Sequence, residues 1–262
     1  MNLFLIKHGI RYFFCSRHAR GHRIHSPFVY SLIRSVFIDT HKYTEYKTIE
    51  RYRHTLQTNK ESIEIKDFGA GSQRLQSTQR IVGDIARTSL SPKKYAQFLF
   101  RVSRHFKPEH ILEIGTSLGI SGAYIAAGSP NAKVITLEGS PSIAHIAQNT
   151  FHTCGVSNIA IRIGNFSDTL TPALQELMRI DFAFIDGNHT KQATLEYFEL
   201  IYPYCNEHSV LIFDDIYWSR DMHEAWKTIC ADPRVSLCID MFKLGIVFFR
   251  KGVVKQNFRI RY

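Results

Sequence analysis

The stretch ILEIGTSLGISGAYIA, residues 111–126, decides the fold of this chain. An apolar run leads into Gly115, and a short loop continues from Thr116 to Gly119. Small and apolar residues suited to a buried helix follow from about Ile120. The pattern predicts a buried strand, a glycine loop and a helix N-terminus, which together present backbone N–H groups to a ligand.

After this stretch, short apolar runs alternate with longer amphipathic segments, as expected for strands of a parallel sheet joined by helices. Five such runs lie at residues 110–115, 134–139, 160–165, 181–187 and 209–215. Two more runs, 236–242 and 245–251, are separated by only two residues, so we expect them to pair antiparallel. The sequence therefore predicts an α/β fold with a Rossmann-like, seven-stranded, mostly parallel sheet and an antiparallel terminal hairpin.

The first part of the chain differs in charge and in pattern. Of the net charge of +10, residues 1–107 contribute 20 basic and 7 acidic side chains, whereas residues 108–262 contribute 13 and 16. Apolar residues before residue 110 recur mostly at helical spacing. We predict a basic, mainly helical N-terminal cap over residues 1–90 and a ligand-binding domain over residues 91–262.

An acidic residue ends the second predicted strand. Glu138 lies 23 residues after Gly115, close to the offset at which a carboxylate binds a ribose diol. The loop lacks the third glycine of a GxGxxG fingerprint, and the chain lacks a GxxxxGK[ST] phosphate loop. The combination favours a nucleoside-containing cofactor other than NAD or a nucleoside triphosphate.

With these motifs, residues 91–251 resemble the class I S-adenosylmethionine-dependent methyltransferases, in particular the small-molecule O-methyltransferases related to catechol O-methyltransferase. The resemblance implies that the glycine loop holds the methionine part of S-adenosylmethionine, that Glu138 binds its ribose, and that the end of the third strand binds adenine. The implied cofactor-binding residues are Glu113, Gly115, Thr116, Ser117, Gly119, Ser121, Glu138, Gly139, Gly164, Asn165, Phe166 and Asp186.

Three carboxylates follow the fourth and fifth predicted strands. Asp186, Asp214 and Asp215 should lie at the carboxyl edge of the sheet, where a divalent cation such as Mg²⁺ would relieve their mutual repulsion. In the catechol-type enzymes the matching positions carry Asp, Asp and Asn and hold a metal, so Asp215 departs from the family pattern. The alternative is that Asp186 or Asp214 caps a helix or contacts the cofactor.

His189 lies three residues after Asp186, where the catechol-type family has a lysine that takes the acceptor's proton. A histidine titrates near neutral pH and suits the same role. The predicted mechanism has Mg²⁺ acidifying the acceptor hydroxyl, His189 taking its proton and the oxyanion attacking the methyl group. An exposed loop histidine is the alternative. Tyr217 and Trp218 would line an aromatic acceptor pocket, or simply pack.

The predicted function is therefore O-methylation of a small hydroxylated acceptor, assisted by a divalent metal. The competing hypothesis is an RNA-binding or RNA-modifying methyltransferase whose basic cap binds phosphates. We consider nucleic acid the less favoured partner, because the aromatic residues of the cap have the spacing of a core face. A homodimer, and contact of the N-terminal 20 residues with a membrane surface, stay open.

Two further expectations concern location and one loop. The five cysteines include no CxxC pair, and the first apolar run is too short for a signal peptide, so we expect a cytoplasmic protein. The segment SIEIKDFGAGS, residues 62–72, imitates a strand and a Gly-x-Gly loop, but no strand–helix series follows it. We expect Gly69-Ala70-Gly71 to lie over the active-site mouth rather than bind the cofactor.

Overall fold

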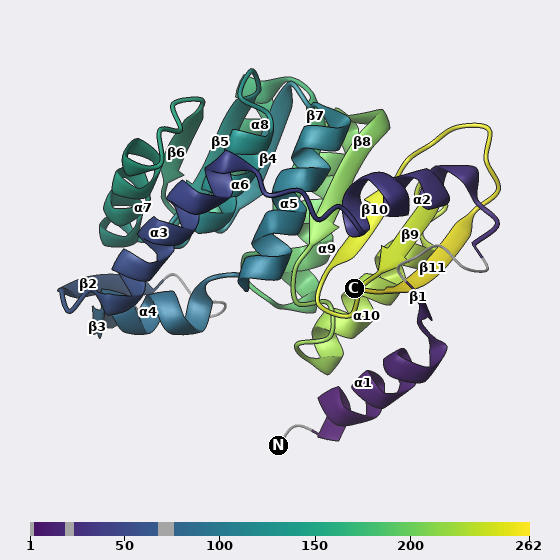
Figure 1. Ribbon diagram of the computed structural model, residues 1–262, viewed down its shortest axis with the longest axis horizontal. Coiled ribbons are helices and arrows are strands. Elements are labelled where there is room, and N and C mark those ends of the chain that lie inside the picture. The colour runs from purple at the N-terminus through teal and green to yellow at the C-terminus, as the bar shows by residue number, and fades with distance from the viewer. Residues whose placement is uncertain (1–2, 19–23, 68–75) are drawn as a thin grey trace. The chain divides into compact units, whose positions relative to one another are not determined.

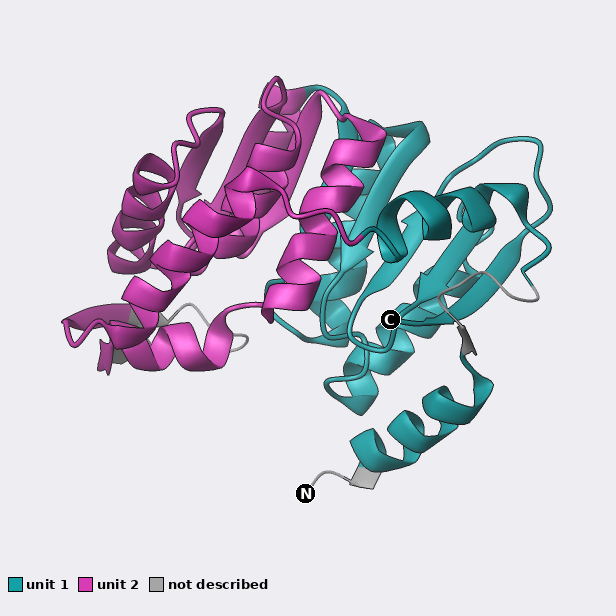
Figure 2. Ribbon diagram, viewed as in Figure 1, with its two compact units in different colours: residues 1–39, 178–262 teal, residues 40–177 magenta. Residues whose placement is uncertain are grey.

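The computed structural model describes residues 3–18, 24–67 and 76–262 and contains two compact units (Figures 1 and 2). Unit 1 comprises residues 1–39 and 178–262, and unit 2 comprises residues 40–177. The domain boundary predicted between residues 90 and 91 falls inside unit 2. The segment with Gly69-Ala70-Gly71 lies outside the described residues.

Unit 2 contains three of the predicted parallel strands. They pair in the order β4 (His110–Ile114), β5 (Lys133–Glu138) and β6 (Ile159–Ile163), and the connections are helical. The helices are α6 (Ile120–Gly128), α7 (Pro141–Thr153) and α8 (Phe166–Leu177). Nearly every residue of β4 and β5 is buried, as expected for parallel strands covered on both faces.

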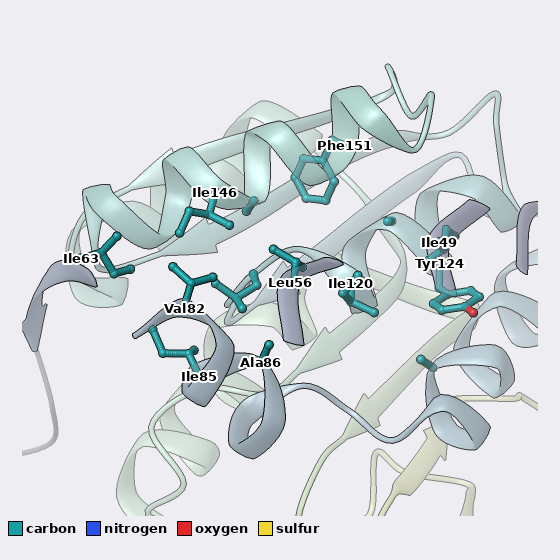
Figure 3. Close-up of a cluster of buried hydrophobic side chains, with 14 of the residues drawn as sticks. Ile49, Leu56, Ile63, Val82, Ile85, Ala86, Ile120, Tyr124, Ile146 and Phe151 are labelled. Carbon is teal, nitrogen blue, oxygen red and sulfur yellow. The ribbon is translucent and has the colours of Figure 1, made fainter. Parts of the chain in front are cut away.

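The helices predicted before the glycine loop are present in unit 2. They are α3 (Thr44–Thr58), α4 (Val82–Ser89) and α5 (Lys93–Phe106). Their apolar faces share one buried cluster with α6 and α7, in which Leu56, Val82, Ile120 and Phe151 are members (Figure 3). The α3 and α4 helices are therefore part of the core of unit 2, not a separate layer.

A two-stranded hairpin interrupts these helices. The strands β2 (Ser62–Asp67) and β3 (Gln76–Ile81) pair antiparallel, with Ser62 opposite Ile81. Ile63 and Ile65 are buried while Ser62 and Glu64 are exposed, which is the period-two alternation of a half-buried strand. The N-terminal region is thus mainly helical as predicted, with one hairpin that the helical interpretation did not include.

Unit 1 contains the other four predicted strands, β7 (Ile180–Ile185), β8 (Cys205–Phe213), β9 (Leu237–Asp240) and β10 (Gly245–Phe248). The pair β7 and β8 is parallel, and β10 runs antiparallel to both β8 and β9. The last two strands therefore form the predicted hairpin. Its connection carries Lys243 and Leu244 back toward the end of β8, because Gly245 pairs with Phe213.

Two strands that the sequence did not predict continue the sheet of unit 1 past this hairpin. The strand β11 (Gln256–Arg261) runs parallel to β9, and the two-residue strand β1 (Arg17–His18) pairs with β11. The segment QNFRIR is mostly polar and lacks the apolar run that marked the other strands. Its place in the sheet depends on pairing with a distant strand, which a local pattern does not reveal.

The helices of unit 1 are α1 (Leu3–Cys15), α2 (Pro27–Leu32), the π-helix η1 (Ile33–Phe37), α9 (Lys191–Ile201), the 3₁₀-helix η2 (Tyr202–Tyr204) and α10 (Arg220–Ala231). Ser26 caps α2 by accepting from the Val29 N–H, and Phe28 lies edge-on against Phe248 of β10 at 5.1 Å between ring centroids. Throughout the described ranges, every helix is too short or too polar to cross a bilayer.

Candidate active site

The glycine loop of unit 2 follows β4 and turns sharply into α6. The backbone N–H groups of Gly115 and Thr116 both donate to the Leu137 carbonyl of β5, at 3.1 and 3.0 Å. Gly119 ends the loop with a φ of +83°, and a Cβ there would lie 3.1 Å from the Ala147 Cα atom. Glycine is thus required both by the left-handed backbone and by the closeness of α7. Binding of a ligand at the N-terminus of α6 stays a prediction.

Glu138 is bound directly to this loop. Its Oε2 atom accepts from the Ser117 N–H and its Oε1 atom accepts from the Ser140 N–H, both at 2.9 Å. Burial raises the pKa of Glu138, and these N–H donors act in the opposite direction. The structure therefore brings the predicted ribose acid next to the predicted methionine loop, as the 23-residue offset required.

Glu113 occupies the interior beneath the loop. It is fully buried and accepts a hydrogen bond from the Thr136 hydroxyl at 2.7 Å, across the register pair that joins β4 to β5. Ser121 of α6 also hydrogen-bonds this carboxyl group, and burial raises the pKa of Glu113 to about 7. Within the described part of the chain its Oε1 atom has no hydrogen-bond partner. Glu113 thus supports the loop, and direct contact with a cofactor stays a prediction.

The third predicted cofactor segment lies at the end of β6. The Gly164 N–H donates to the Glu138 carbonyl at 2.9 Å, so this segment adjoins the end of β5, where Gly139 follows Glu138. The Asn165 carbonyl accepts from the Thr169 N–H at 3.0 Å, and α8 begins at Phe166. Unit 2 therefore gathers its predicted cofactor residues at the carboxyl ends of three adjacent strands.

The acidic residues predicted to hold a metal lie at the carboxyl ends of two neighbouring strands in unit 1. Asp186 follows β7, and Asp214 and Asp215 follow β8. The Asp214 N–H donates to the Ile185 carbonyl at 2.9 Å, which joins the two strand ends. Asp214 is only 3% exposed, and burial raises the pKa of its carboxyl group although Lys243 works against the shift.

Lys243 is the residue of this site that the sequence interpretation missed. Its Nζ atom lies 2.7 Å from Asp215 Oδ1 and 3.1 Å from Asp214 Oδ1. Burial alone would lower the pKa of Lys243, but the two carboxylates outweigh burial and raise it. Across the described ranges, no three His, Cys, Asp or Glu side chains are arranged as a metal site. The sequence contained a signal for this residue, because Lys243 lies in the connection of the predicted hairpin. Pairing of the hairpin's second strand with β8 brings that connection next to Asp214 and Asp215.

His189 lies in the loop between β7 and α9. Its Nε2 atom is 3.4 Å from Asp186 Oδ1. Burial lowers the pKa of His189, Asp215 raises it and Lys243 lowers it. The net lowering keeps the imidazole neutral at pH 7, the form that accepts a proton. The structure therefore places His189, the predicted base, next to Asp186.

The two aromatic residues after the Asp pair have different environments. Tyr217 is buried, donates to Asp240 Oδ2 at 2.8 Å and stacks on Phe242 at 4.7 Å between ring centroids. These contacts fit the packing role, and Tyr217 also lines a cavity of unit 1, so its place in an acceptor pocket stays a prediction. Trp218 is 60% exposed and remains accessible to a ligand.

Comparison with known proteins agrees with this arrangement. Residues 112–216 match the family model described as a methyltransferase domain. This part of the chain is similar to a methyltransferase domain. The resemblance to class I methyltransferases and the mostly parallel α/β fold are thereby confirmed.

Individual relatives of the methyltransferase domain are O-methyltransferases. The chain is 30% identical over 131 residues to a catechol O-methyltransferase of Niastella koreensis, covering 49% of this chain and 58% of the relative. It is 27% identical over 135 residues to a catechol O-methyltransferase of Mycobacterium tuberculosis, covering 51% and 59%. The chain thus spans less than two thirds of the length of these relatives.

Solved structures show the same fold at low sequence identity. A putative O-methyltransferase from Klebsiella pneumoniae matches with a TM-score of 0.58 and 18% identity, over 84% of this chain and 94% of that one. An O-methyltransferase from Bacillus cereus in complex with SAH matches with a TM-score of 0.56 and 22% identity, over 82% and 95%.

Proposed function

We propose that this protein is an S-adenosylmethionine-dependent methyltransferase that transfers a methyl group to a hydroxyl oxygen of a small acceptor molecule. The observation that carries the proposal is the bond between the glycine loop and Glu138, whose Oε2 atom accepts from the Ser117 N–H at 2.9 Å. Such an arrangement presents a helix N-terminus to a carboxylate-bearing ligand and an acid to a ribose diol. The O-methyltransferase names of the relatives support the reaction type.

In this proposal each part of the cofactor has its own residues in unit 2. Gly115 to Gly119 would hold the methionine part, Glu138 and Gly139 the ribose, and Gly164 to Phe166 the adenine. When bound, the sulfonium of S-adenosylmethionine supplies an activated methyl group, so the protein needs mainly to position the acceptor oxygen in line with it. Nothing in the names of the relatives supports the RNA-directed alternative.

His189 would remove the acceptor's proton. If the Nε2–H group points toward Asp186 Oδ1, at 3.4 Å, the Nδ1 atom is left to accept that proton. Asp186 then orients the imidazole and stabilises the imidazolium that forms. With S-adenosylmethionine bound, the deprotonated acceptor oxygen would take the methyl group and S-adenosylhomocysteine would be the leaving group.

Assistance by Mg²⁺ is not part of this proposal. A divalent cation at the predicted position would bind the carboxylates of Asp214 and Asp215, and the Lys243 ammonium group contacts one oxygen atom, Oδ1, of each. The donor set as described fits a protonated amine and does not fit a metal ion. We therefore derive no step through a metal.

Calorimetric titration with S-adenosylmethionine tests the cofactor site. We expect the purified chain to bind it, and the Glu138→Gln variant to bind about 10- to 100-fold more weakly, because a hydrogen bond to a charged group contributes roughly 1.5–3 kcal/mol. Glu176→Gln is the matched control, since Glu176 is a surface residue of unit 2 paired with Arg162. Failure of the folded chain to bind S-adenosylmethionine would overturn the proposal.

The pH dependence of methyl transfer to catechol, used as a model acceptor, tests His189. We expect His189→Ala to lose most of its turnover near neutral pH, by roughly 10²- to 10⁴-fold, and to recover part of it at high pH, where the acceptor ionises unaided. Turnover equal to that of the unmodified protein at every pH would remove His189 from the proposed mechanism.

A further inference from the structure

The Asp214 and Asp215 carboxylates of unit 1 share one cationic partner, Lys243. We infer that this carboxylate pair is a site for the Lys243 ammonium group and not for a divalent cation, so that methyl transfer by this chain requires no metal ion. The second half of the inference rests on the proposed function. The first half concerns only the residues of unit 1 and stands without it.

The ammonium group contacts one oxygen atom of each carboxylate that a metal would bind. Asp214 Oδ1, 3.1 Å from the Lys243 Nζ atom, also accepts from the Asp215 N–H at 2.8 Å. The second contact joins Nζ to Asp215 Oδ1 at 2.7 Å. Mg²⁺ binds oxygen at about 2.0–2.1 Å in octahedral geometry. An ion at that distance from both Oδ1 atoms would have to displace Lys243.

Charge also argues against joint occupation by Lys243 and a metal. The two carboxylates carry two negative charges, and the ammonium group already neutralises one of them. A divalent cation beside a positive group in this largely buried setting would meet strong Coulomb repulsion, because solvent screening is weak there. Asp214 is 3% and Lys243 21% exposed at the side chain. The metal and the lysine are therefore mutually exclusive occupants.

The backbone holds Lys243 in place. Its carbonyl accepts from the Ile216 N–H at 3.3 Å, which ties the hairpin connection to the segment that follows the Asp pair. The Lys243 N–H donates to the Met241 carbonyl at 2.9 Å, and the Met241 N–H donates to the Leu244 carbonyl at 2.8 Å. The lysine is thus placed by a tight turn between β9 and β10, and not by a loosely attached loop.

The third predicted metal ligand also faces a basic group. Asp186 Oδ1 lies 3.4 Å from the His189 Nε2 atom. The three carboxylates are therefore divided between a lysine and a histidine. An ammonium group has three N–H donors, of which two reach Asp214 and Asp215, so one is left for an acceptor oxygen. Lys243 would then supply to an acceptor oxyanion the positive charge that a metal supplies elsewhere.

Titration with Mn²⁺, followed by the electron paramagnetic resonance signal of the free ion, tests the occupant of the site without any activity measurement. We expect the unmodified chain to bind no Mn²⁺ at this site, and Lys243→Met to gain one bound Mn²⁺ ion. Lys191→Met is the control, because Lys191 forms an exposed ion pair with Glu224 at 3.0 Å, and its removal should create no site.

Several outcomes would overturn the inference. One is a single Mn²⁺ ion that the unmodified chain binds and the Asp214→Asn variant does not. This comparison needs no Lys243 variant, so it can be made even if Lys243→Met fails to fold. Another is one Mn²⁺ ion bound with the same affinity by the unmodified chain and by Lys243→Met.

A measurement of methyl transfer with and without EDTA distinguishes failure of this inference from failure of the proposed function. We expect methyl transfer to be unchanged by EDTA, and a loss that Mg²⁺ restores would contradict the inference. If no methyl transfer is found at all, the proposed function fails, while the Mn²⁺ titration still decides which cation the Asp pair binds.

Discussion

At the scale of single residues, Gly119 shows how one backbone position shapes the cofactor loop. Its φ of +83° belongs to the left-handed region, and a Cβ atom would lie 3.0 Å from the Phe151 ring and 3.1 Å from Ala147. Gly155, at the end of α7, has a similar φ of +70° but open space around it. The two glycines therefore separate the cost of backbone conformation from the cost of crowding.

We expect Gly155→Ala to lower the free energy of unfolding by about 1–2 kcal/mol, the usual cost of placing an L-residue in the left-handed region. Gly119→Ala should cost this amount plus roughly 1–3 kcal/mol for overpacking against α7. Urea unfolding of both variants measures the difference. Equal losses of stability would mean that the loop adjusts to the added methyl group and that α7 does not constrain it.

The residues of the site differ in how far the sequence could predict them. Gly115, Gly119 and Glu138 follow from local rules, because a buried strand, a glycine loop and an acid at a fixed offset are close in the chain. Lys243 was not predicted, since its partners lie 28 and 29 residues away and meet it only through the pairing of β10 with β8. Local patterns predict at which end of a strand the functional residues lie. They do not predict which side chain of a distant hairpin joins the site.

At the scale of elements, α3 is fixed to the core of unit 2 by a partly buried polar network. The Tyr124 hydroxyl of α6 donates to Glu50 Oε1 at 2.8 Å, and Arg53 Nε donates to the same atom at 3.0 Å. Arg53 also donates to the Ser91 carbonyl at 2.9 Å. Helical periodicity predicted α3 correctly, but its polar residues gave no indication that they bind α6 and the start of α5.

We expect Tyr124→Phe to destabilise the protein by about 1–2 kcal/mol, because the change removes a hydrogen bond to a charged, largely buried carboxylate. Tyr52→Phe is the control, since Tyr52 lies on α3 with Glu50 and no hydrogen bond from its hydroxyl is seen within the described residues. We expect this variant to lose no more than about 0.5 kcal/mol of stability. Thermal unfolding of the two variants checks the ordering. A larger effect at Tyr52 would contradict the role given to the network.

At the scale of the whole molecule, basic residues from both ends of the chain gather around one cavity of unit 1. In unit 1, Arg11 of α1 lines a cavity of about 480 Å³ together with Lys227 of α10 and Arg259 of β11. His223 also lines this cavity, where its ring is 4.8 Å from the His8 ring and stacks on Tyr217 at 4.4 Å.

A homodimer, a cytoplasmic location and contact with a membrane surface stay predictions.

This collection of positive charge predicts an acid-sensitive fold. Burial, together with the charges of His8, Lys227, Arg259 and Arg11, lowers the pKa of His223 to about 4. The unfolded chain takes up a proton at this histidine near pH 6.5, whereas the folded chain does so only near pH 4. Between these values the unfolded state binds more protons, so stability falls as the pH falls.

We expect His223→Phe to reduce this loss of stability at acid pH, because phenylalanine keeps the aromatic stacking on Tyr217 and has no site that binds a proton. The Nδ1 atom of His223 is buried without a hydrogen-bond partner in the described part of unit 1, so its removal leaves no donor or acceptor unpaired. The free energy of unfolding should rise by about 1–2 kcal/mol at pH 4.5, a value reduced for partial solvent screening of the histidine. It should not change at pH 8, where this histidine is neutral in both the folded and the unfolded state. Urea unfolding of both proteins at the two pH values provides the measurement. An equal change at pH 4.5 and pH 8 would mean that His223 acts through packing alone.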